Sequence, residues 1–401
     1  MEVAAIVAEY NPFHKGHAYQ VARTREAGAD CVIAVMSGNF VQRCEGAMID
    51  KRARAEMALR GGVDLVVELP LPWATASAER FAFGAVSLAH ATGIVTRLSF
   101  GSECGDAQLL MKAAKLVAGL DGDTGLKEAL REGDSFPAAR ERALACLTDD
   151  EAVLRVLRSP NDILGVEYCK ALLSLASPVV PYAVRRVGAG HDSAGESEGY
   201  LSASALRGRL MHSSDSGGSG VFLPAATREI IEREREKGHA PADFHALETA
   251  VLADLRKRDK DYFLRLPDVS EGLENRLADA ACAAASLADL YARVKTKRYT
   301  LSRVRRVVLA AFLEVLEEYA ASPPPYIRVL GFNGRGRELL GAMKRSAALP
   351  VVTRYKEIAA LPTRARELFA LEARATAVYN LSLPAKRPGN TEYTDQTVIL
   401  D

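Results

Sequence analysis

The segment VAAIVAEYNPFHKGHAYQVA, residues 3–22, carries the most informative pattern in the chain. Its residues 3–8 form a short, continuous apolar run, which is typical of a strand buried on both faces of a parallel sheet. An Asn-Pro pair then marks a turn, and apolar residues at helical spacing begin at Gly16. The segment therefore predicts a strand, a turn and the start of a helix.

The same alternation continues through the first half of the chain. Further short apolar runs, most of them rich in Val and Ile, occur at 31–36, 63–69, 97–100 and 179–184. Segments with helical spacing of apolar residues lie between the runs, at 16–27, 50–59 and 79–91. Because alternating strands and helices pack as a parallel sheet covered by helices, we expect a doubly wound α/β fold.

The rest of the chain departs from this alternation. Residues 105–160 predict helices inserted between two strands, and 188–220 have the Gly- and Ser-rich composition of loops. Further helices are predicted at 227–237, 243–258, 272–285, 286–294 and 302–321, followed by a strand at 326–332, a helix at 334–344 and a strand at 350–353. We expect an α/β domain over 1–220 and a mainly helical domain with a small α/β tail over 221–401.

Composition narrows the class of protein. The 401 residues include 52 basic and 51 acidic side chains, so net charge does not imply a nucleic-acid partner, although a local basic patch is possible. No apolar run reaches the length of a membrane helix and the N-terminus lacks a signal-peptide pattern, so we expect a soluble cytoplasmic protein. The six scattered cysteines have no CxxC spacing, which predicts neither disulfides nor a cysteine zinc site.

His14 and His17 are the candidate catalytic residues. Their spacing places both imidazoles on one side of a first helical turn, where unpaired backbone amides attract phosphate. Gly16 lets the backbone approach a ligand closely. The alternatives are that the histidines are ordinary polar residues at a helix cap, or that they bind a metal, although no nearby carboxylate or cysteine completes a ligand set.

At these residues the sequence resembles the HxGH nucleotidyltransferase superfamily, which activates substrates with ATP and releases pyrophosphate. LSASALR, residues 201–207, resembles a second superfamily motif, which holds the triphosphate. Ser202 and Ser204 match its hydroxyl positions, and Arg207 matches its basic position. The two motifs occur in the expected order, so the resemblance implies a nucleotide site shared by the two segments.

A narrower resemblance spans nearly the whole chain. It is carried by NPFHKGH (11–17), MSGNFVQR (36–43), DKRARAEMAL (50–59), DLVVELP (64–70), FGSECGD (100–106), SPNDILGVEYCKAL (159–172), YAVRRVGAG (182–190) and TKRYTLSRVRR (296–306). Together these motifs resemble the tRNA(Met) cytidine acetate ligase family. The resemblance implies that acetate and ATP form acetyl-adenylate, and that the acetyl group then passes to N4 of the wobble cytidine of elongator tRNA(Met).

The resemblance also implies the residues of the ATP site. They are Val7, Ala8, Glu9, Tyr10, Asn11, Pro12, Phe13, His14, Lys15, Gly16, His17, Ala18, Tyr19 and Gln20, with Gly101, Asn161, Arg186, Ser202, Ser204 and Arg207. Mg²⁺ is expected to accompany the triphosphate. From the residues alone, Gly101 could instead be a turn glycine, Asn161 a helix N-cap and Arg186 a solvated side chain.

One loop departs from the family pattern, because Cys44 and Gly46 stand where Gly and Pro are more usual. This difference puts the shape of the loop in doubt and leaves the ATP site unaffected. Cys44 is not expected to act as a nucleophile, since acyl-adenylate chemistry needs no covalent enzyme intermediate.

Two basic groups are candidates for RNA binding. The segment 293–306 has no acidic residue, and its candidates are Lys295, Lys297, Arg298, Arg303, Arg305 and Arg306. Tyr299 within it could stack on an unpaired base. The alternative is a solvated helix face. A smaller group with Lys51 and Arg54 could face RNA, pyrophosphate or water.

Two other functions compete with the ligase. A nucleotidyltransferase of small-molecule cofactor metabolism would share the first half of the chain but would not need the long helical half with its basic segment. A non-catalytic RNA-binding protein could retain a vestigial nucleotide pocket, although intact His14, Gly16, His17 and Arg207 argue against it. No pattern in the sequence identifies an acetate pocket, a general base or an oligomeric state.

Overall fold

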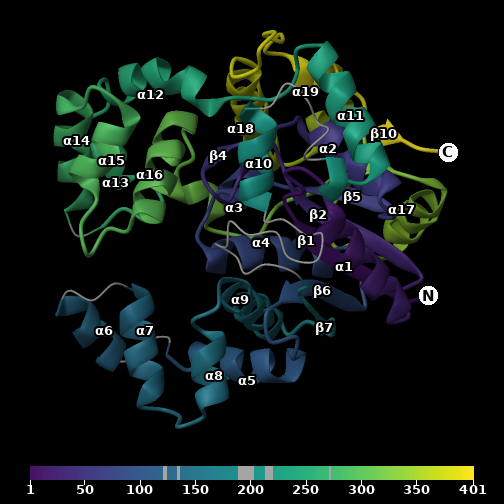
Figure 1. Cartoon of the computed structure of the whole chain (residues 1–401), viewed down its shortest axis with the longest axis horizontal. Helices are drawn as coiled ribbons and strands as arrows, with labels where there is room; N and C mark the ends of the chain where they lie inside the picture. Colours follow the sequence, from purple (N-terminus) through teal and green to yellow (C-terminus); the bar gives the residue numbers. More distant parts are fainter. Residues whose placement is uncertain (121–123, 133–135, 188–202, 213–219, 271) are drawn as a thin grey trace.

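The computed structural model describes residues 1–120, 124–132, 136–187, 203–212, 220–270 and 272–401 (Figure 1). Five strands of its main sheet are parallel neighbours in the order β5-β2-β1-β6-β7. They are β1 (Val3–Ala8), β2 (Cys31–Ser37), β5 (Leu65–Leu69), β6 (Arg97–Ser102) and β7 (Val180–Arg185). These are the five predicted strands, so the doubly wound α/β fold is confirmed.

Helices cover both faces of this sheet, as the continuous apolar runs predicted. They include α1 (Lys15–Glu26), α2 (Lys51–Arg60), α4 (Ala78–Ala91) and α9 (Pro160–Ser174). Successive side chains of β2 point to opposite faces of the sheet and belong to two hydrophobic clusters. Val32 and Ala34 belong to the cluster that includes α2, whereas Ile33 and Val35 belong to the cluster that includes α4 and α9. Burial on both faces explains why the strands show no polar alternation.

The predicted helical insertion lies between β6 and β7. It comprises α5 (Ala107–Ala118), α6 (Thr124–Arg131), α7 (Phe136–Ala145) and α8 (Glu151–Val156). Figure 1 shows α6 and α7 projecting from the sheet, whereas α5 packs against α9.

Three further elements of the first half are short. β3 (Phe40–Val41) and β4 (Glu45–Gly46) precede α2 in the sequence, and α3 (Leu71–Ala74) follows β5.

The next part of the chain is helical, as predicted from residue 227 onward, but the loop prediction for 188–220 is wrong over 203–212, where the chain forms a helix. It comprises α10 (Ala203–His212), η1 (Gly220–Phe222), α11 (Ala225–Glu236), η2 (Phe244–Leu247), α12 (Glu248–Leu255), α13 (Lys260–Leu264), α14 (Leu273–Ala283), α15 (Leu287–Val294) and α16 (Leu301–Leu313). The prediction of one helix over 302–321 is wrong beyond Leu313. Glu314 adopts a left-handed backbone (φ 57°) that ends α16, and only η3 (Glu317–Ala320) follows.

The C-terminal α/β tail belongs to the main sheet, which the predicted division at residue 220 did not anticipate. β8 (Ile327–Phe332) pairs antiparallel with β5, and β9 (Val351–Val352) and β10 (Val398–Ile399) pair with β8. The tail also contains α17 (Gly334–Ser346), η4 (Tyr355–Ala360), α18 (Thr363–Asn380) and α19 (Thr391–Thr394). The long helix α18 is absent from the predicted elements. The chain therefore returns to its first layer after the helical region.

Candidate nucleotide site

A pocket of about 440 Å³ opens at the carboxyl ends of the strands. β1 and β6 are neighbours in the sheet, and the chain winds outward from them in opposite directions, which is where doubly wound sheets bind ligands. The volume is in the range of small-molecule sites. The predicted ATP residues that line the pocket are Val7, Ala8, Glu9, His14, Gly16, His17, Tyr19, Gln20, Gly101, Asn161, Arg186, Ser204 and Arg207.

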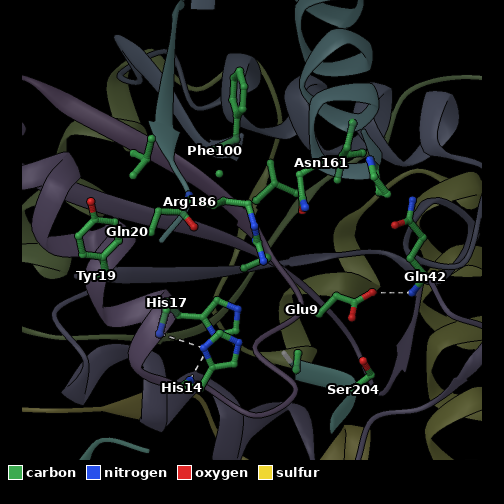
Figure 2. A pocket seen from close by; sticks show the side chains of 18 of the residues that line it. Glu9, His14, His17, Tyr19, Gln20, Gln42, Phe100, Asn161, Arg186 and Ser204 are labelled. Carbon is green, nitrogen blue, oxygen red and sulfur yellow. Dashed lines mark hydrogen bonds between the residues drawn. The ribbon is translucent and has the colours of Figure 1, made fainter. Parts of the chain in front are cut away.

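His14 and His17 form a reciprocal cap at the start of α1 (Figure 2). His14 Nδ1 accepts the Gly16 N–H at 3.0 Å, and His17 Nδ1 accepts the His14 N–H at 3.2 Å. The two rings stack with their centroids 3.8 Å apart. Since each Nδ1 is an acceptor, a neutral ring carries its proton on Nε2. Capping and ligand binding are therefore compatible, because they use different nitrogens.

Burial keeps both histidines neutral. It lowers the pKa of His14 to about 4, with the charges of Arg186 and Arg207 acting in the same direction. The pKa of His17 is also lowered, first by burial and then by His14 and Arg186. The Gly16 and His17 amides of the first turn are already bonded to His14, so the sequence-based expectation of unpaired amides is wrong for these two residues. At neutral pH the pair offers two N–H donors at the positive end of the α1 dipole, an arrangement suited to phosphate oxygens.

Gly16 is required by the His14 ring. A Cβ at this position would lie 2.8 Å from Cε1 of His14 and 3.0 Å from its Nδ1. Any larger residue would displace the imidazole and break the cap. The glycine of HxGH therefore sets the position of the first histidine.

Arginines surround the histidine pair. Arg207 of α10 donates to the Asn11 carbonyl at 3.3 Å and lies 3.5 Å from the Glu45 carboxylate, so it joins the two predicted motifs. Arg186 follows β7 and packs over Gly101, whose Cβ would lie 3.5 Å from Arg186 Cγ. Arg43 and Arg185 also line the pocket, and Glu9 is the only carboxylate among its described lining residues.

Asn161 is not a helix N-cap, because Ser159 holds that position in α9. Its side-chain amide donates to Glu103 Oε1 at 2.5 Å. In return, the Asp162 carboxylate accepts the Glu103 N–H at 2.8 Å. These two hydrogen bonds connect the loop after β6 to the start of α9. Glu103 is a positioning residue that the sequence did not single out, although it lies within the quoted FGSECGD motif.

Part of the predicted ATP stretch supports the pocket without lining it. Tyr10, Asn11, Pro12 and Phe13 are buried, Lys15 is exposed, and Ala18 is half-buried outside the lining. The Tyr10 ring contacts the rings of Phe13 and His17, each at 4.9 Å between centroids. Direct ATP contact by every residue from 7 to 20 is therefore not what the pocket indicates. Ser202 lies outside the described residues.

The expectation that Lys51 and Arg54 could face RNA, pyrophosphate or water is wrong, because both side chains are fully buried. Lys51 Nζ lies 2.5 Å from a carboxylate oxygen of Glu68 and 2.5 Å from one of Glu392. Arg54 donates to the backbone carbonyls of Glu9, Ser37, Gly38 and Ile49. Arg54 thus braces the ends of β1 and β2 beneath the pocket.

The basic segment 293–306 lies at the surface around the start of α16. Lys295, Lys297, Arg298 and Arg305 are exposed, whereas Arg303 and Arg306 are half-buried. Arg306 pairs with the Asp268 carboxylate at 3.0 Å, and Arg303 donates to the Asp268 carbonyl at 2.9 Å. The ring of Tyr299 is buried, so the prediction that it stacks on a base is not supported.

Cys44 has the environment of a structural thiol. It is buried, and burial raises its pKa to about 12, which suppresses the nucleophilic thiolate. Its backbone is left-handed (φ 62°), a conformation that glycine adopts more easily than cysteine.

All six cysteines are free thiols. Within the described part of the chain, no group of three or more His, Cys, Asp or Glu side chains could hold a metal ion. No helix in that part is both long and apolar enough to cross a membrane.

A pocket at the switch point of a doubly wound sheet, with an HxGH cap and arginines around it, defines a nucleotidyltransferase class of protein. The family model described as HIGH Nucleotidyl Transferase matches residues 1–394. The chain belongs, more narrowly, to the tRNA(Met) cytidine acetate ligase family. It is 38% identical to the protein of that name from Thermoanaerobacter sp. (strain X514), over 89% of this chain and 90% of that protein.

Relatives from Thermotoga maritima are similar in sequence and structure. The tRNA(Met) cytidine acetate ligase of that organism is 42% identical, over 86% of this chain and 85% of the relative. The crystal structure of apo T. maritima TmcAL superposes with a TM-score of 0.94 at 38% identity, covering both chains completely. The structure of TmcAL bound with alpha-thio ATP superposes with a TM-score of 0.91 over the same coverage and at the same identity.

Proposed function

We propose that this protein activates acetate with ATP and transfers the acetyl group to N4 of the wobble cytidine of elongator tRNA(Met). The observation that carries the proposal is the neutral His14–His17 cap, with two donors at a helix N-terminus inside an arginine-lined pocket. The names of the relatives and the alpha-thio ATP bound to TmcAL support the same activity. A protein that modifies bacterial tRNA would act in the cytoplasm.

The first step would place ATP with its phosphates at the start of α1. An acetate oxygen attacks the α-phosphorus, and pyrophosphate leaves. Nε2–H of His14 and His17, the positive end of the α1 dipole and Arg207 would stabilise charge as it moves onto the leaving phosphates. Since Glu9 is the only described carboxylate of the pocket, a Mg²⁺ ion would be held mainly by the triphosphate and water.

The second step would bring tRNA to the same pocket. The exposed side chains Lys295, Arg298 and Arg305 are the best candidates for phosphate contacts. Arg303 and Arg306, which contact Asp268, would contribute less. The helical region therefore would supply RNA affinity, and the sheet would supply the chemistry.

The test is acetate-dependent exchange between ATP and pyrophosphate, followed by acetyl transfer to an elongator tRNA(Met) transcript. His17→Ala should lower exchange by roughly 10²–10³-fold, because it removes one donor from the charge-stabilising site. His90→Ala is the control, since His90 is exposed on α4 and its ring contacts Ser177 at 3.0 Å.

Three outcomes would contradict the proposal. Near-full exchange by His17→Ala would remove the histidines from the chemistry. Exchange that ignores acetate but responds to another small substrate would favour a nucleotidyltransferase of cofactor metabolism. Silence with ATP, together with tRNA binding, would favour a non-catalytic RNA-binding protein.

A further inference from the structure

Glu9 is the one acidic residue among the described residues that line the pocket. Every other charged residue described in the lining is an arginine: Arg43, Arg185, Arg186 and Arg207. ATP, acetate and the acyl-adenylate are all anions, so a carboxylate among them opposes binding. Because Glu9 opposes the binding of ATP and acetate, we look for its role in a later step of the reaction.

The structure holds Glu9 firmly in place. Its Oε1 accepts the Gln42 backbone N–H at 2.9 Å, and Arg54 holds its carbonyl. Figure 2 shows the side chain between the histidine pair and Gln42. Tyr168, another residue of the pocket lining, feels the charge of Glu9, which adds to the effect of burial in raising the pKa of that tyrosine. The carboxylate is therefore fixed beside the place where phosphates are expected, on the side of the 42–44 loop.

That loop connects the pocket with the basic segment. Gln42 and Arg43 line the pocket, and the next residue, Cys44, lies within electrostatic reach of both Glu9 and the α16 arginines Arg305 and Arg306. Glu9 is bonded to this loop through the Gln42 N–H, and the same loop continues to Cys44, whose thiol feels the charges of the α16 arginines. A base that enters from that surface would meet this carboxylate.

We propose that Glu9 accepts a hydrogen bond from the N4 amine of the wobble cytidine and takes its proton during acetyl transfer. This inference rests on the proposed function. The N4 lone pair attacks the acetyl carbon of the mixed anhydride, the C–N bond forms, and the bond from that carbon to the phosphate oxygen breaks. AMP leaves with the electron pair, and one N4 proton passes to the Glu9 carboxylate.

The chemistry of cytosine fits a carboxylate. The N4 amine donates hydrogen bonds, and acidic side chains are its usual partners in base recognition. Uracil presents an acceptor at the same position and would be repelled. Burial also raises the pKa of Glu9, while Arg207 and Arg43 act against the rise, and a higher pKa improves a carboxylate as a general base near neutral pH.

The experiment separates the two half-reactions. Glu9→Gln keeps the shape and the acceptor for the Gln42 N–H but cannot take a proton. Acetyl transfer from preformed acetyl-adenylate should fall by about 10²–10⁴-fold, the usual contribution of a general base, and exchange should fall far less. Glu9→Asp keeps a carboxylate but places it one methylene closer to the backbone. Its rate of acetyl transfer should therefore lie between those of Glu9→Gln and the wild type.

Glu26→Gln is the control. It removes an exposed carboxylate of α1 that pairs with Arg23 outside the pocket lining, so both half-reactions should stay close to wild type. A transcript with uridine at the wobble position, used as an inhibitor, adds a second readout. Glu9→Gln should narrow the difference in affinity between the cytidine and uridine transcripts.

Two results would overturn the proposed role of Glu9, and a third would overturn the proposed function itself. Equal losses in exchange and transfer would overturn the role of Glu9 and assign it to ATP or its metal ion. Unchanged transfer by Glu9→Gln would also overturn it. If the wild-type protein itself shows no acetate-dependent exchange, the proposed function fails first, and the two failures are thereby distinguished.

Discussion

Two groups of basic residues behave in opposite ways in this protein. Lys51 and Arg54 are fully buried, and their charges are satisfied by Glu68, Glu392 and backbone carbonyls. Lys295, Arg298 and Arg305 are exposed at the surface near α16. In the sequence both groups are short clusters of Lys and Arg, and both were candidates for RNA binding.

The difference comes from partners that are distant in the sequence. Glu392 lies in α19, and Arg328 of β8 completes the cluster by pairing with Glu68 at 3.1 Å and with Glu392. A basic residue is free to meet RNA only if the fold does not bring it a carboxylate. Charge clusters in a sequence therefore need their tertiary neighbours before they indicate a binding surface.

The largest expected effect is the loss of Lys51. Lys51→Met leaves Glu68 and Glu392 buried with one cation fewer, so the free energy of unfolding should fall by about 3–5 kcal/mol. Urea denaturation followed by circular dichroism measures the change. Lys295→Met is the control, and an exposed substitution should stay within about 0.5 kcal/mol of wild type. Similar losses in both variants would break the distinction between the two groups.

The second effect concerns the exposed group. Replacing Lys295, Arg298 and Arg305 together with Gln should weaken tRNA binding and reduce the salt slope by about one unit for each lost phosphate contact. Binding is measured across a salt titration, with pyrophosphate exchange recorded on the same protein. We expect exchange to change much less than tRNA affinity.

The control for this triple variant is Arg337, Lys344 and Arg345, which are exposed on α17, on the other side of the molecule from α16 (Figure 1). Their replacement by Gln removes the same charge from another surface. An equal drop in salt slope for both triples would mean that tRNA responds to net charge alone. An unchanged slope for the α15–α16 triple would move the RNA path elsewhere.

The smallest effect comes from Glu372, a third buried carboxylate near Lys51. Burial and the charge of Glu68 raise its pKa to about 8, so it is largely protonated at neutral pH, unlike Glu392, whose pKa is lowered by Arg328 and Lys51 against the effect of burial. Because the folded state holds this proton more tightly than the unfolded state does, stability falls as pH rises from about 4.5 through 8.

Glu372→Gln should remove that part of the pH dependence. Near pH 6 the variant and wild type should differ by less than about 1 kcal/mol, because a neutral group replaces a neutral group that accepts the Leu71 N–H. At pH 8 the variant should gain relative to wild type. Urea titrations at the two pH values measure the difference, and a large loss at pH 6 would show that Glu372 is ionised there.

Local sequence was enough to predict much of the fold and of the pocket. The apolar runs predicted the five parallel strands, because a strand buried on both faces leaves a continuous apolar signal. The HxGH segment and LSASALR predicted two parts of one pocket, and Arg207 does contact the Asn11 carbonyl. Glu103 and the 42–44 loop were missed as parts of the site, because their roles depend on contacts with α9 and Glu9.

What the sequence determined by itself is what depends on neighbours in the chain: the strand–turn–helix of residues 3–26, the reciprocal histidine cap, and the glycine that the cap requires. Only the tertiary structure decided that the C-terminal tail completes the first sheet, that Lys51 and Arg54 are internal, and that Glu9 faces an arginine-lined pocket. The physical reason is that periodicity and capping act over a few residues. Burial and charge pairing depend on side chains that only the folded chain brings together.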